Sequence, residues 1–298
     1  MALRLLLTVL TLLVAGCALR WAPADSGSAP ADSVVVENGW VRVADEGPRD
    51  APAVVMIHGF GSHLGVWESV LPALDGYRVL RLDLLGFGAS SRRPGEYRPE
   101  DQANAVLAAM DAAGIDRAAV VAHSMGATVA LTLALQAPER VSRLTLLAPW
   151  VYDEQVPWAY RDARRPGVGE LVVGLWHAEQ LAWRFEYSFY DDSFVTEDML
   201  DSARQAMRRP GTRAAALATI RGLDLASRQD GYVAVSQPVL IVTGREDRVS
   251  TLPFAERLAA QLPVARLEVL PWCGHLPMIE APEQTRRLVR YWLDRGRR

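Results

Sequence analysis

The amino-acid sequence predicts an α/β fold with a mostly parallel central sheet flanked by helices. Short runs of apolar and β-branched residues, typical of buried strands, occupy residues 54–57, 77–82, 143–147 and 239–243. Helical patterns separate the strands of the first half, and strands that alternate with helices form parallel sheets covered on both faces. The alternation stops over residues 149–235, where the sequence is helical. We therefore expect a helical insertion after the sixth strand.

The first 33 residues indicate export and a tether. Arg4, the apolar run from Leu5 to Val14 and the small residues after it are typical of a signal peptide spanning residues 1–16. The run is too short to span a bilayer comfortably. The sequence Val-Ala-Gly-Cys that ends at Cys17 resembles the bacterial lipobox, which implies lipidation of Cys17. Cleavage without lipid and an uncleaved anchor are the alternatives.

We therefore expect an exported protein that is lipid-anchored to a bacterial membrane through Cys17. The residue after the cysteine is an alanine, which favours the outer membrane, facing the periplasm, if there is one. Residues 17–33 are rich in Ala, Pro and Ser and read as a flexible tether. With Cys17 assigned to lipid, Cys273 has no partner for an intrachain disulfide and is expected to be a packed thiol.

Composition excludes several classes of function. The chain has 298 residues, half of them hydrophobic, and a formal net charge of −3. It can therefore bury a full core, and it lacks the basic excess of a nucleic-acid-binding protein. The histidines, at positions 58, 63, 123, 177 and 275, show no ligand spacing with cysteines or carboxylates, which argues against a metal site. No motif indicates a cofactor, and the oligomeric state cannot be predicted.

The expected core is formed by residues 34–148 and 236–298, and the expected cap by residues 149–235. Residues 40–43 read as an edge strand, and residues 66–74 as a helix. Other helices are expected at residues 99–114, 169–180, 196–208, 212–223 and 282–295.

Ser124 lies at the sharpest corner of the predicted fold. The strand pattern stops at this serine, and a helical pattern starts at the next residue. A turn of almost no length leaves the serine at a strained corner, where the small residues Ala122 and Gly126 let strand and helix approach closely. The corner suits a nucleophile, although a serine with a purely structural role is the alternative for this motif taken alone.

The stretch Ala-His-Ser-Met-Gly around Ser124 resembles the nucleophile elbow of the α/β-hydrolase superfamily, with Ala122 in place of the first glycine. Residues 58–61, His-Gly-Phe-Gly, resemble its oxyanion loop, and residues 83–90 resemble its D-x-x-G-x-G-x-S loop. The resemblance covers nearly everything from residue 34 onwards, and it implies an α/β-hydrolase fold with a capped active site.

The resemblance also implies a Ser–His–Asp triad. Asp247 follows the strand 239–243 and His275 follows the last strand, so Ser124, Asp247 and His275 occur in the chain order of the superfamily. His275 would take the serine proton and return it to the leaving group, while Asp247 would fix the imidazole tautomer.

The resemblance places further groups around the triad. The backbone N–H groups of Phe60 and Met125 would form the oxyanion hole. Four side chains are candidates for the pocket: His58, His123, Trp150 and Trp183. His58 is expected to organise the oxyanion loop rather than act as a base, and Asp83 to tie down its own loop.

A serine at position 124 argues against the haloalkane dehalogenase and epoxide hydrolase branches, which use an aspartate there. An aromatic-rich cap indicates an apolar acyl or alkyl pocket, unless its rings only attach the cap to the sheet. We expect a serine hydrolase that cleaves carboxylic esters with an apolar group. The alternatives are hydrolysis of carbon–carbon bonds in dienone acids, acyl transfer, and a hydrolase-like binding or sensing protein without useful turnover.

Overall fold

The computed structural model describes residues 29–174 and 185–295, and Cys17 and Trp183 therefore lie outside the described residues. An eight-stranded sheet in the order β1-β2-β4-β3-β5-β6-β7-β8 forms the centre of the fold. The pairs β1–β2 and β2–β4 are antiparallel and all the other pairs are parallel. The fold class predicted from the sequence is confirmed. The strands are β1 Ser33–Val36, β2 Gly39–Glu46, β3 Ala53–Ile57, β4 Arg78–Leu82, β5 Ala118–His123, β6 Val141–Leu147, β7 Val239–Gly244 and β8 Ala265–Leu270.

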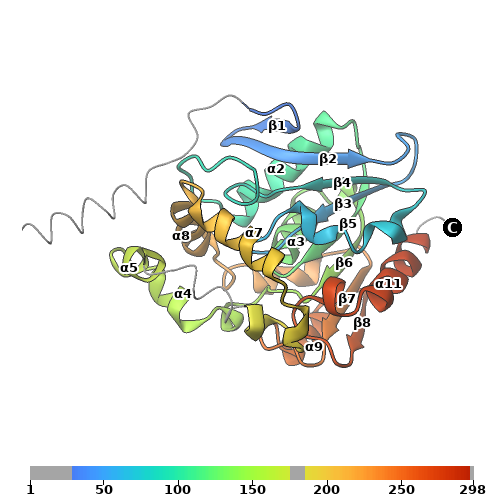
Figure 1. Cartoon of the computed structure of the whole chain (residues 1–298). Helices are drawn as coiled ribbons and strands as arrows, with labels where there is room; N and C mark the ends of the chain where they lie inside the picture. The colour runs from blue at the N-terminus through green and yellow to red at the C-terminus, as the bar shows by residue number, and fades with distance from the viewer. Residues whose placement is uncertain (1–28, 175–184, 296–298) are drawn as a thin grey trace, which may run out of the picture.

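Helices flank the sheet, and the view in Figure 1 shows the cap helices gathered on one side and α11 on the other. The α-helices are α2 Pro99–Ala112, α3 Met125–Gln136, α4 Trp158–Ala163, α5 Val168–Gly174, α7 Glu197–Arg208, α8 Thr212–Gly222, α9 Leu252–Gln261, α10 Pro277–Glu280 and α11 Pro282–Asp294. Short 3₁₀ helices occur at η1 Leu64–Trp67, η2 Leu71–Leu74, η3 Pro138–Arg140, η4 Asp153–Gln155, η5 Asp192–Phe194 and η6 Gln229–Ala234. No helix in the described part of the chain is long and apolar enough to cross a membrane.

Each face of the sheet has its own hydrophobic core, because side chains alternate along every strand. In β3, Val55 and Ile57 pack with α2, α3 and α9, whereas Val54 and Met56 pack with η1, η2 and α11. All four side chains are fully buried. A fully buried side chain of this size contributes about 1.5–3 kcal/mol, so the two layers hold the sheet rigidly. The strand ends that carry the candidate site therefore have a fixed support.

The cap lies between β6 and β7, and its described elements are all helical. Ala163 of α4, Val173 of α5 and Leu217 of α8 form a small core of their own, and Phe60 from the sheet packs against it. Phe60 belongs to the loop after β3. The cap therefore contacts the sheet at the loop that follows this strand.

Two predicted elements were wrong in detail. Residues 40–43 belong to a longer strand, β2, which is not at the edge, because β1 pairs with it through a two-residue hairpin turn. The predicted helix at residues 66–74 is instead the two 3₁₀ helices η1 and η2. Pro72 lies in η2, and its missing N–H prevents a continuous α-helix through this segment.

Candidate active site

Ser124 occupies a strained turn between β5 and α3. Its φ of 52° and ψ of −122° lie in a region that L-residues rarely adopt. The surrounding backbone holds this conformation: the Ser124 N–H donates to the carbonyl of Leu147 (3.0 Å), and the Ser124 carbonyl accepts from the N–H of Trp150 (3.1 Å). Because hydrogen bonds hold the strained backbone on both sides, the Ser124 hydroxyl has a fixed position at the carboxyl end of the sheet.

Glycines allow the backbone around Ser124 to pack this closely. A Cβ atom at Gly126 would lie 2.5 Å from the carbonyl oxygens of Ile57 and His58, so helix α3 can approach β3 only because residue 126 has no side chain. A Cβ at Gly59 would lie 3.0 Å from the Cβ of Ser124. The small residues around the serine therefore bring the end of β3 against the turn.

Three predicted residues come together in one hydrogen-bonded chain. His275 Nε2 lies 2.9 Å from Ser124 Oγ, and His275 Nδ1 lies 2.9 Å from Asp247 Oδ2. All three residues are buried, with 4–6% of their surface exposed. We call Ser124, His275 and Asp247 the triad. The hydroxyl, the imidazole and the carboxylate are aligned as a proton-transfer chain requires.

The carboxylate of Asp247 is held in its ionised form. Burial alone would raise its pKa, but the nearby His275 and hydrogen bonds from His275, Ser250 and Val249 outweigh this effect and lower the pKa below its usual range. The N–H groups of Val249 and Ser250 donate to Oδ1 at 2.7 and 2.8 Å. Oδ2 is thereby left to face the imidazole, and it fixes the proton of the ring on Nδ1.

The loops after β7 and β8 bind each other, which brings Asp247 and His275 together. Glu246 and Cys273 exchange two hydrogen bonds of 3.0 Å, one between their backbones and one from the Cys273 N–H to the Glu246 carboxylate. A side chain at Gly244 would collide with the Cys273 carbonyl, so this glycine permits the close approach.

One backbone N–H in the loop after β3 and one directly after Ser124 make no hydrogen bond with the part of the chain that the structure describes. Among the hydrogen bonds of the described residues, neither the N–H of Phe60 nor that of Met125 has an acceptor. Met125 is the first residue of α3, so its N–H also lies at the positive end of a helix. The two donors that the sequence predicts for an oxyanion hole are therefore available to a ligand.

His58 and Asp83 organise loops. The Leu84 N–H donates to His58 Nε2 (3.0 Å), so the ring carries its proton on Nδ1, which donates to the Gly59 carbonyl (2.8 Å). Burial lowers the pKa of His58 and keeps the ring neutral. Asp83 accepts from the N–H groups of Leu64 (2.6 Å) and Ala89 (2.7 Å). His58 is fully buried beneath the loop and does not line a pocket.

His123 is buried against His275 rather than exposed in a pocket. The two rings lie 4.9 Å apart between their centroids, and His123 Nε2 lies 2.8 Å from the His275 carbonyl oxygen. Burial, together with the nearby His275, lowers the pKa of His123 to about 3. The residue beside the nucleophile is therefore a neutral donor to the backbone of His275.

Aromatic rings surround the side chain of Phe60. Phe60 lies 5.4 Å from Phe87, 6.4 Å from Trp150 and 5.8 Å from Tyr160, measured between ring centroids. Trp150 and Tyr160 follow β6 and belong to the cap, while Phe87 follows β4. The surroundings of the Phe60 side chain are therefore apolar. The fourth pocket candidate, Trp183, lies outside the described residues.

Sequence reasoning did not identify Glu280 as a site residue. Its buried carboxylate accepts hydrogen bonds from the backbone on both sides of His275. The available signal was an acidic residue five positions after His275, in the short segment between Pro277 and Pro282.

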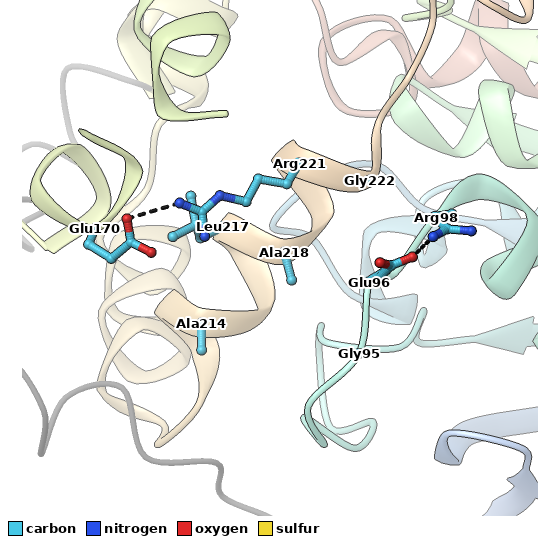
Figure 2. A pocket seen from close by; sticks show the side chains of 9 residues that line it. All are labelled: Gly95, Glu96, Arg98, Glu170, Ala214, Leu217, Ala218, Arg221 and Gly222. Carbon is cyan, nitrogen blue, oxygen red and sulfur yellow. Dashed lines mark hydrogen bonds and ion pairs between the residues drawn. The ribbon is translucent and has the colours of Figure 1, made fainter. Parts of the chain in front are cut away.

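A separate cavity of about 460 Å³ lies between α8, α5 and the loop before α2. Figure 2 shows two charged pairs among the lining residues: Arg221 of α8 with Glu170 of α5, and Arg98 with Glu96 in the segment before α2. No triad residue lines it. The described residues contain no cluster of His, Cys, Asp and Glu that could hold a metal ion.

Comparisons with known proteins agree with the fold. The sequence profile of the alpha/beta hydrolase fold family matches residues 52–282. A pimeloyl-[acyl-carrier protein] methyl ester esterase from Nitrosomonas europaea is 34% identical over 250 residues, which are 79% of this chain and 93% of the relative. A 2-hydroxymuconate semialdehyde hydrolase from Pseudomonas putida is 31% identical over 229 residues, covering 72% of this chain and 76% of the relative. The crystal structure of a meta-cleavage product hydrolase from Pseudomonas fluorescens superposes with a TM-score of 0.77 at 27% identity, covering 89% of this chain and 97% of the other.

Proposed function

Because the chain belongs to the alpha/beta hydrolase fold family of hydrolases, we propose that it is a serine hydrolase that cleaves carboxylic esters with an apolar acyl or alkyl group. The observation that carries this proposal is the hydrogen-bonded chain from Ser124 through His275 to Asp247, together with two backbone N–H groups that have no acceptor among the described residues. A nucleophile, its base and oxyanion donors are the groups that acyl transfer to water requires.

In the proposed reaction Ser124 Oγ attacks the ester carbonyl while His275 Nε2 takes the hydroxyl proton. The negative charge that develops on the carbonyl oxygen is stabilised by the N–H groups of Phe60 and Met125, a contribution of roughly 3–4 kcal/mol per donor in other enzymes. His275 then returns the proton to the leaving alcohol, which departs and leaves the acyl group on Ser124. Water activated by His275 hydrolyses this intermediate and restores the serine.

The surroundings of the oxyanion donors support an apolar substrate. Phe87, Trp150 and Tyr160 pack around the ring of Phe60, the residue that carries one of the proposed donors. We call these four rings the aromatic wall, and burial of an acyl or alkyl chain against such rings is favourable. The relative from Nitrosomonas europaea is named as an esterase, which agrees with this class of bond.

The proposal is tested with the full-length chain and aryl esters of short to long acyl groups. We expect hydrolysis that Ser124→Ala lowers by roughly 10⁴-fold or more, and that the exposed control Ser227→Ala leaves unchanged. A fluorophosphonate probe should label the wild type at Ser124. A folded protein that labels but hydrolyses no ester would contradict the ester assignment, and a folded protein that does not label would favour a binding or sensing role.

Hydrolysis of carbon–carbon bonds in dienone acids is the second candidate. It is favoured by the names of the relative from Pseudomonas putida and of the similar structure from Pseudomonas fluorescens. Arg184, a candidate cation for holding an acidic substrate, lies outside the described residues. The loss of the dienone absorbance measures this reaction directly. A kcat/KM for a dienone acid above that for the best ester would replace the ester assignment.

A further inference from the structure

We infer that Glu280 is a positioning residue of this site, whose carboxylate fixes the loop that carries His275 and joins that loop to the cap. The inference rests on the proposed function in one respect, because it assumes that His275 activates Ser124. It does not depend on which bond the enzyme cleaves.

Glu280 holds the backbone on both sides of His275. The Gly274 N–H donates to both carboxylate oxygens, at 3.0 and 3.1 Å, and the Leu276 N–H donates to Oε1 at 3.2 Å. The one-turn helix α10 places the Glu280 side chain back under this loop. Because the residues before and after His275 bind the same rigid group, the peptide units that direct the His275 ring have little freedom.

The same carboxylate reaches the cap. The N–H of Tyr190, which precedes α7, donates to Oε2 at 2.7 Å. The His275 N–H donates in parallel to the carbonyl of Ser188 at 2.7 Å. Gly274 is the residue that allows this contact, since a Cβ atom there would lie 2.7 Å from the Ser188 oxygen and from the Tyr190 nitrogen. Residues 188 and 190 of the cap therefore hold the loop that carries His275 through hydrogen bonds.

Glu280 is suited to this role because it is buried and still accepts several hydrogen bonds. Only 9% of its surface is exposed. Burial, with a smaller effect from Asp247, raises its pKa above the usual range, although the hydrogen bonds from Tyr190, Gly274 and Leu276 act in the opposite direction. A carboxylate has only acceptors to offer, which matches a site lined by N–H groups. An amide of the same shape would turn an NH₂ group towards one of these donors.

The consequence for catalysis is specific. Loss of the Glu280 carboxylate should let the His275 imidazole move from the Ser124 hydroxyl, and a displacement of about 1 Å can cost roughly 100-fold in rate. Among the hydrogen bonds of the described residues, none joins Glu280 to Phe60, Met125 or the aromatic wall. We therefore expect kcat to fall while KM changes little.

The test compares Glu280→Gln with two control variants in the full-length protein. Glu283→Gln removes an exposed carboxylate three residues further along the chain. Gln237→Ala removes a buried amide that donates to the Pro138 carbonyl at the opposite end of β7, and so reports on destabilisation alone. For each protein we would measure the rate constant of fluorophosphonate labelling at Ser124, kcat and KM for the best substrate, and Tm.

We expect Glu280→Gln to lower the labelling rate constant and kcat by roughly 10- to 100-fold, with KM within about twofold of the wild type. Both controls should label at the wild-type rate, even if Gln237→Ala lowers Tm as much as Glu280→Gln does. Labelling of Glu280→Gln within twofold of the wild type would overturn the inference. A wild type that labels without hydrolysing esters would overturn only the ester assignment, whereas a wild type that does not label would overturn both.

Discussion

The His123 ring donates a 2.8 Å hydrogen bond from Nε2 to the carbonyl oxygen of His275. The residue beside the nucleophile thus holds the backbone of the residue that is proposed to be its base, across 152 positions of the chain. The other ring nitrogen, Nδ1, carries no proton and has no hydrogen-bond partner in the described structure. His123 can take up a proton only if this buried ring becomes charged.

The first prediction concerns the stability of the fold in acid. The pKa of His123 is about 3 in the folded protein and about 6.5 when unfolded, so between these values the unfolded chain binds a proton that the folded chain does not. The free energy of unfolding should therefore fall as pH falls, with His123 contributing up to about 1.4 kcal/mol per pH unit. His123→Gln keeps a donor and removes this titration. Urea unfolding between pH 6 and 4 should show a shallower slope for the variant, and equal slopes would contradict the prediction.

The second prediction concerns Asp247. Asp247→Asn can still accept hydrogen bonds from Val249 and Ser250, but its NH₂ group would face His275 Nδ1 and favour the wrong tautomer. We expect kcat to fall by roughly 10³- to 10⁴-fold with little change in KM, as in other triad enzymes. Steady-state kinetics measure this, with the exposed Asp230→Asn as the control. A loss below tenfold would show that Asp247 does not orient the imidazole.

The third prediction concerns Gly126. Gly126→Val would place side-chain atoms against the carbonyls of Ile57 and His58 and push α3 away from β3. Overpacking of this kind costs about 1–3 kcal/mol, and the same shift would move Ser124. Gly231→Ala is the matched control, because a Cβ at position 231 meets no atom within 4 Å. Urea unfolding and fluorophosphonate labelling should both report a loss for Gly126→Val. Wild-type values for both would refute the close approach.

The fourth prediction concerns Cys273. Burial, reinforced by Glu280, Asp247 and Glu246, raises the pKa of this thiol, so it carries almost no reactive thiolate at neutral pH. Iodoacetamide should leave Cys273 unmodified and activity intact in the folded protein, and should modify it after denaturation in guanidinium. Peptide mass spectrometry distinguishes it from Cys17. Rapid modification of native Cys273 would argue against a packed role.

The fifth prediction concerns Cys17, which lies outside the described residues. If this cysteine is lipidated in a bacterial host, the N-terminal peptide should carry the mass of acyl chains and the protein should sediment with membranes. Each buried methylene adds about 0.8 kcal/mol to such anchoring. Cys17→Ser should shift the protein to the soluble fraction, while Cys273→Ser should not. Membrane association without added acyl mass would support an uncleaved anchor instead.

Much of this fold could be predicted because many of its strands and turns are marked by residues that are neighbours in the sequence. The apolar run at residues 54–57 and the abrupt change of pattern at Ser124 identify a strand and a strand–helix turn from neighbouring residues alone. The hairpin of β1 was missed because Val34, Val35 and Val36 are a short run next to a tether-like segment. Its turn, which includes Asn38 before Gly39, was a usable signal.

The contacts within the site depended on features that the sequence pattern does not carry. That Asp247 and His275 each follow a strand is visible in the sequence, but their meeting depends on β7 and β8 being neighbours. The direction of the His123 ring depends on its side-chain torsion angles, which no periodicity reveals. The reach of Glu280 depends on the single turn of α10, an element too short to show a helical pattern.

The position of β8 has a consequence for the timing of activity. Among the described residues it is the last strand and lies at the edge of the sheet beside β7, yet it delivers His275 to the serine that follows β5. Contacts between residues this far apart form late, because a long loop must close first. A growing chain that has already made Ser124 lacks His275, its proposed base, until residue 275 has been synthesised and β8 has docked. In the proposed mechanism the order of the strands therefore keeps Ser124 inactive during synthesis.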